Sequence, residues 1–131
     1  MIGLDTNVVV RYLAQDDPAQ SALAARLFES LSTDRPGFIS HVVLAETVWV
    51  LESCYATEAP AVAKVVETLL RTDALVVERT ETVWRALRHF LRSRGDFVDT
   101  LVTELARAAG CDTIYSFDRA ASKRAGMTLL R

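Results

Sequence analysis

The chain opens with MIGLDTN (residues 1–7), a short apolar run that ends at the carboxylate of Asp5. Residues 8–13 continue with apolar side chains at helical spacing, so this segment predicts a strand, a turn and then a helix. In open α/β sheets, chemistry gathers beyond the carboxyl ends of the strands. Asp5 is therefore a candidate site residue, and we expect other polar groups to converge on it.

Strands and helices alternate along the remaining residues, with no internal repeat. This order predicts one α/β domain over residues 1–131, in which helices cover a parallel sheet. Asp17, Ser40, Thr57 and Thr80 are the expected helix caps. We predict strands at 38–39, 75–78, 113–117 and 127–130, and helices at 18–31, 41–54, 60–71, 81–91, 97–109 and 119–125.

Composition and charge narrow the class of protein. No apolar run approaches the roughly 18 residues that cross a membrane, and no secretion signal precedes the first strand, so a cytoplasmic protein is expected. Cys54 and Cys111 are far apart in sequence, and both are expected to be buried free thiols.

The net charge of −2 argues against a surface coated with basic residues. When the five acids considered next are set aside, the chain has 12 acidic residues and 15 Lys and Arg residues. This excess of positive charge is compatible with a groove that holds phosphates.

Five carboxylates stand where an apolar element ends or would prefer an apolar side chain. Asp5 and Asp118 each end a strand, Asp96 and Asp99 are three residues apart at a helix start, and Glu46 interrupts an apolar helix. Each has a simpler explanation. Asp96 and Asp118 are good helix caps, and Asp5 suits a local turn. Glu46 and Asp99 are also compatible with solvated positions or with helix-dipole partners.

Clustered carboxylates restrict the chemistry that is possible. Two of them about 4 Å apart repel by roughly 4 kcal/mol at an effective dielectric constant of 20, so they either take up protons or bind cations. A site with four or more acids and no His or Cys nearby offers only oxygen ligands, which suit Mg²⁺ or Mn²⁺ better than zinc. The fitting reaction is hydrolysis of a phosphodiester.

With these residues in place, the chain resembles a PIN domain of the VapC-type toxin branch over nearly its whole length. The combination of motifs, in this order and at these separations, is specific, whereas each one alone is common. The motifs are IGLDTN at 2–7, LAE at 44–46, GDFVDTL at 95–101 and YSFD at 115–118.

The resemblance implies a three-layer α/β/α sandwich and an endoribonuclease that depends on Mg²⁺ or Mn²⁺. By position in the motifs, Asp5, Glu46 and Asp99 match the acids that hold the metal, and Asp118 matches a fourth acid that organises it. Asp96 matches an additional acid found in part of the family. Three further residues match supporting positions, Thr6 and Asn7 beside the first acid and Ser116 before the last.

The resemblance also implies partners: an RNA substrate such as tRNA or rRNA, a small VapB-like antitoxin, and a second copy of the chain in a homodimer. Arg11 and Arg119, each close in sequence to a site acid, are the candidates for contacts with RNA phosphates, and the simpler explanation for both is a solvated side chain. Two alternatives stay open. One is a PIN nuclease of housekeeping RNA processing without an antitoxin, and the other is a non-catalytic scaffold that binds RNA or protein.

Overall fold

The computed structural model describes residues 1–131 as an α/β fold in which every strand pairing is parallel. The expected α/β class with a parallel sheet is confirmed. The helices are α1 (Thr6–Ala14), α2 (Pro18–Ser30), α3 (His41–Cys54), α4 (Ala59–Arg71), α5 (Thr80–Ser93), α6 (Phe97–Ala108) and α7 (Arg119–Arg124). The strands are β1 (Ile2–Gly3), β2 (Gly37–Ile39), β3 (Leu75–Val77), β4 (Tyr115–Ser116) and β5 (Thr128–Leu129).

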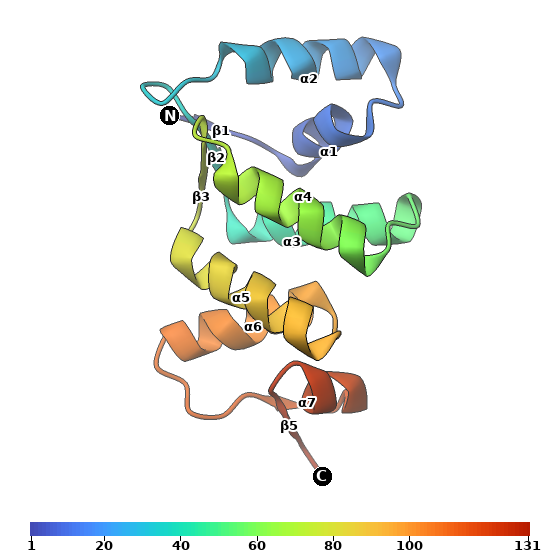
Figure 1. Ribbon diagram of the computed structural model, residues 1–131, viewed down its shortest axis with the longest axis vertical. Coiled ribbons are helices and arrows are strands. Elements are labelled where there is room, and N and C mark those ends of the chain that lie inside the picture. The colour runs from blue at the N-terminus through green and yellow to red at the C-terminus, as the bar shows by residue number, and fades with distance from the viewer.

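The strands form two sheets, where a single parallel sheet was expected. One sheet has the order β1-β2-β3, and β4 pairs with β5 in a separate two-stranded sheet. Figure 1 shows the first sheet near the N-terminus, and α7 and β5 at the opposite end of the molecule beside the C-terminus. The carboxyl ends of β1 and β4, which carry Asp5 and Asp118, therefore belong to different sheets.

Helices pack on the three-stranded sheet around one apolar core. In α5 the apolar spacing places Val83, Ala86, Leu87 and Phe90 in the core. Gly37 in β2 packs tightly: a Cβ there would lie 2.9 Å from methyl groups of both Leu4 and Leu31, so a larger residue would force these side chains to shift. None of the helices is both long and apolar enough to span a bilayer.

Capping explains most helix starts, with two corrections. Asp17 accepts a hydrogen bond from the Gln20 amide and Ser40 one from the Val43 amide, so both predicted caps are confirmed. Thr57 is not a cap, since α4 begins after Glu58 without a side-chain cap. Thr80 is the first residue of α5, and its hydroxyl instead donates back to the carbonyl of Val77 at 2.6 Å.

The two cysteines also differ from expectation. Cys54 and Cys111 are free, as predicted, but both are exposed. Cys54 is the last residue of α3, and Cys111 follows α6 in the connection to β4. Each cysteine lies at or just after the end of a helix. Its apolar neighbours in the sequence therefore did not indicate that its own side chain is buried.

Candidate active site

The first part of the site forms where β1 ends. Asp5 caps α1, and its Oδ1 accepts a hydrogen bond from the Thr6 amide at 2.8 Å. The Thr6 hydroxyl donates to Oε1 of Glu46, on α3, at 2.9 Å. Thr6 therefore holds two exposed carboxylates, 41 positions apart in the sequence, on the same groove of about 430 Å³. Asn7, whose supporting role stays a prediction, also lines this groove.

The second part of the site forms at the start of α6. Asp96 caps this helix by accepting a hydrogen bond from the Asp99 amide at 3.0 Å. Partial burial, followed by the nearby negative charges of Asp96 and Asp118, raises the pKa of the Asp99 carboxyl above its ordinary value. Asp99 therefore lies close enough to Asp96 and to Asp118 to be repelled by both, although Asp118 follows a strand of the separate sheet.

Asp118 is held in place by its own local structure. Its Oδ1 accepts hydrogen bonds from the amides of Ala120 and Ala121 at 2.8 and 3.1 Å, so it caps α7. The hydroxyl of Ser116 accepts a hydrogen bond from the Asp118 amide at 2.9 Å, which supports the turn between β4 and α7. The predicted capping is thus confirmed for Asp96 and Asp118, and Asp5, for which a local turn was the alternative, also caps a helix. The second carboxylate oxygen of each makes no hydrogen bond within the chain.

Glu52 is an acid that the motifs do not reveal. It is half-buried on α3, and burial, then the charges of Asp96 and Asp99, raise the pKa of its carboxyl. The available signal was its spacing from Glu46: residues 46, 49 and 52 follow one another at intervals of three along one side of the helix. Glu46, Trp49 and Glu52 indeed line one groove together with Asp96.

These acids line three adjoining grooves beside α3. Glu46 lines both the groove of Asp5 and the next one, and Glu52 and Asp96 line that groove and a third one that holds Asp99. The predicted site acids are thus on one continuous surface, except that Asp118 lines none of these three grooves. This surface is wider than a single compact cluster.

The carboxylates of the site suit a hard divalent cation, but only two of them at a time are candidates to hold one ion. All the acids offer carboxylate oxygens, which Mg²⁺ and Mn²⁺ prefer. No three acidic, histidine or cysteine side chains converge closely enough to hold one metal ion. Mg²⁺, however, is commonly held by one or two carboxylates and fills its remaining positions with water and substrate phosphates. Asp5 and Glu46, which both hydrogen-bond to Thr6 and line one groove, are the pair of carboxylates that could supply such ligands.

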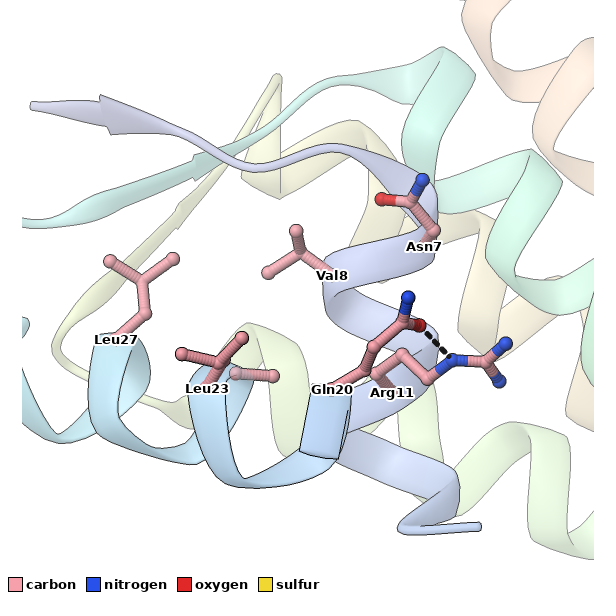
Figure 2. A pocket seen from close by; sticks show the side chains of 7 residues that line it. Asn7, Val8, Arg11, Gln20, Leu23 and Leu27 are labelled. Atoms are coloured by element: carbon pink, nitrogen blue, oxygen red, sulfur yellow. Dashed lines mark hydrogen bonds between the residues drawn. The ribbon is translucent and has the colours of Figure 1, made fainter. Parts of the chain in front are cut away.

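The two arginines differ in their surroundings. Arg11 on α1 donates from Nε to Gln20 on α2 at 2.7 Å, and Figure 2 shows this bond beside an apolar groove between the two helices. Its Nη1 also lies 3.2 Å from Asp16. Arg119 is exposed at the start of α7, and its side chain makes no hydrogen bond or ion pair within the chain. Of these two arginines, Arg11 alone lines the groove of Asp5 and Glu46.

Replacing Asp99 by asparagine is expected to stabilise the metal-free protein at neutral pH. The raised pKa means that the folded chain binds more protons than the unfolded chain, so the stability contributed by this group falls as pH rises through the ordinary carboxylate range. The cost of burying this carboxylate, followed by repulsion from Asp96 and Asp118, opposes the favourable helix dipole in the first turn of α6. We expect Tm at pH 7 in EDTA to rise by about 1–4 °C, since water screens most of the repulsion.

Thermal melts of the wild type, Asp99→Asn and the exposed-turn control Asp34→Asn measure this effect. The gain is expected for Asp99→Asn alone, and it should shrink below about pH 4, where carboxyl groups are protonated in the unfolded chain as well. A Tm for Asp99→Asn at or below that of the wild type at pH 7 would contradict the expectation.

Comparison with known proteins agrees with the motifs and the fold. The family model described as PIN domain matches residues 2–127. A protein named VapC ribonuclease from Aquifex aeolicus (strain VF5) is 29% identical over 117 residues, which cover 88% of this chain and 86% of that protein. The matched region includes the acids of all four motifs. The chain belongs to the PIN domain family.

Proposed function

We propose that this chain is a VapC-like endoribonuclease that depends on a divalent metal and is the toxin of a toxin–antitoxin pair. The observation that carries the proposal is the Thr6 bridge, which joins Asp5 and Glu46 on one groove. The similarity to a protein named VapC ribonuclease supports RNA as the substrate. A non-catalytic scaffold has no need to hold two like charges on one groove.

In the proposed site, Asp5 and Glu46 would hold Mg²⁺ or Mn²⁺, and Asp96 and Asp99, with Asp118 near Asp99, would provide further carboxylates in or beside the adjoining grooves. Such a cation supplies Lewis-acid chemistry: it makes water more acidic and offsets the charge of a phosphodiester. The side chains fix the geometry. The α1 cap orients Asp5, Thr6 orients Glu46, and Ser116 supports the turn that carries Asp118.

The function is tested by incubating the purified protein with a mixed pool of tRNA and rRNA. We expect discrete cleavage products with Mg²⁺ or Mn²⁺ and intact RNA in EDTA, with cutting restored when excess metal is added back. Cleavage that persists unchanged in EDTA would contradict metal dependence, and intact RNA under all metal conditions would contradict the nuclease itself.

Replacing Thr6 by valine is expected to lower kcat by about 10–100-fold, the usual cost of losing a group that orients a metal ligand. Valine keeps the shape of the side chain but cannot donate to Glu46. The rate of RNA cleavage at saturating metal measures the loss, and Thr6→Ser, which keeps the hydroxyl, is the control that should recover most of the activity. Equal rates for Thr6→Val and the wild type would show that the bridge is not needed.

We also propose the partners that accompany such a toxin: a small VapB-like antitoxin, a second copy of the chain in a homodimer, and a cytoplasmic location. The similarity to a VapC ribonuclease supports this group of proposals. An open reading frame for a small antitoxin-like protein directly upstream would distinguish the toxin from a housekeeping nuclease. Light scattering of the purified chain tests the homodimer.

A further inference from the structure

Arg11 lines the groove of Asp5 and Glu46 and is held by three side chains, of which only Tyr55 lines the same groove. Its Nε donates to Gln20 at 2.7 Å, and its Nη1 donates to Asp16 at 3.2 Å and to Tyr55 at 3.4 Å. These partners come from α2, from the turn after α1 and from the end of α3. The guanidinium group is therefore held from several sides, although the side chain is 32% exposed.

Tyr55 and Asp16 also bind each other. The Tyr55 hydroxyl donates to Oδ2 of Asp16 at 2.6 Å, while Oδ1 of Asp16 accepts from Arg11. The hydrogen bond from Tyr55, together with Arg11, lowers the pKa of the Asp16 carboxyl, so Asp16 stays ionised to a lower pH than an ordinary aspartate. Arg11, Asp16 and Tyr55 thus form a closed triangle of hydrogen bonds.

The triangle leaves part of the guanidinium free. Nη2 of Arg11 makes no hydrogen bond within the chain, so its two N–H groups are available. Figure 2 shows the outer end of the side chain extending beyond α1, past the bond to Gln20. Arg11 and Tyr55 both line the groove of Asp5 and Glu46. A fixed cationic donor therefore stands in the same groove as the two carboxylates.

Stability does not explain this arrangement. Asp16 is exposed and Arg11 is partly exposed, with side-chain exposures of 46% and 32%, and ion pairs that reach solvent in this way add little to folding stability. Ordering a long arginine side chain also costs conformational entropy. A fixed arginine is instead useful for binding a phosphate, which accepts paired hydrogen bonds from the planar guanidinium group.

We propose that Tyr55 and Asp16 are positioning residues that hold Arg11 so that its free Nη2 binds a phosphate oxygen of RNA in the groove of Asp5 and Glu46. This inference rests on the proposed function, because it takes RNA as the substrate. It adds two residues outside the acid motifs and gives each a role that acts through Arg11. Asp16 and Tyr55 themselves need not touch the RNA.

The test measures binding of a short fluorescent single-stranded RNA in EDTA at several salt concentrations, for the wild type and for Arg11→Ala, Tyr55→Phe and the double variant. Arg11→Ala is expected to weaken binding about 10-fold and to lower the slope of log affinity against log salt by about one. Tyr55→Phe is expected to weaken binding about threefold. In the Arg11→Ala background it should have no further effect, because Tyr55 acts through Arg11.

Arg26→Ala is the matched control, since Arg26 is exposed on α2 and forms no ion pair or hydrogen bond. It should leave the affinity within about twofold of the wild type. Equal weakening by Tyr55→Phe in both backgrounds, or an unchanged salt slope in Arg11→Ala, would overturn the inference. Wild type that binds no RNA in EDTA would also overturn the inference. The proposed nuclease is tested separately by the cleavage assay with Mg²⁺ or Mn²⁺, because without a metal the carboxylates of the groove repel phosphates.

Discussion

Replacing Asp5 by asparagine is expected to slow RNA cleavage by at least about 10²-fold while leaving the fold intact. Asparagine caps a helix about as well as aspartate, so α1 should still begin at residue 6. The substitution removes the negative charge with which residue 5 would hold a cation. The loss of one fixed electrostatic group at an active site typically costs about 10²–10³ in kcat.

A matched control separates charge at the site from charge at a helix cap. Asp17 caps α2 through the Gln20 amide, but it lines none of the grooves that contain the site acids. Asp17→Asn is therefore expected to cleave RNA at the wild-type rate. Equal cleavage by Asp5→Asn and the wild type would contradict the assigned role of Asp5 and would point to a contaminating nuclease.

Replacing Phe97 by alanine is expected to lower the free energy of unfolding by about 3–5 kcal/mol. Phe97 is fully buried at the first position of α6, and its ring meets that of Phe90 on α5 edge to face at 5.7 Å. The cavity would loosen the start of the helix that places Asp96 and Asp99. Denaturant unfolding measures the loss, and cleavage should fall with it.

Phe117→Ala is the control for the same change in side chain. Phe117 is 78% exposed, so this substitution should change the stability by less than about 0.5 kcal/mol. A loss at Phe97 that is as small as the loss at Phe117 would contradict the assignment of Phe97 to the core.

The elements that the sequence predicts best are those determined by local chemistry. Asp17 and Ser40 cap as predicted because each short polar side chain reaches an amide three residues ahead. The predicted cap at Thr80 was wrong because its hydroxyl donates to the carbonyl of Val77, and this contact depends on how the chain leaves β3. Thr57 lies one residue too early, and no side chain caps α4.

The site was predictable where a motif fixes local geometry. The sequence shows that Asp5 follows a strand and that Glu46 lies in an apolar helix. In the structure, Thr6 hydrogen-bonds to both of them. Glu52 was missed because its importance depends on Asp96 and Asp99, which reach it only through tertiary packing. The separation of β4 from β1 depends on long-range strand pairing, which local sequence patterns do not specify.

The most direct test of the central claim is to locate Mn²⁺ in crystals of the protein by its anomalous scattering. We predict a peak at the carboxylates of Asp5 and Glu46, which the Thr6 bridge holds on one groove. The peak should be absent from crystals of Asp5→Asn soaked in the same way. A map of the wild type with no peak at these two carboxylates, at a Mn²⁺ concentration that supports cleavage, would contradict the account.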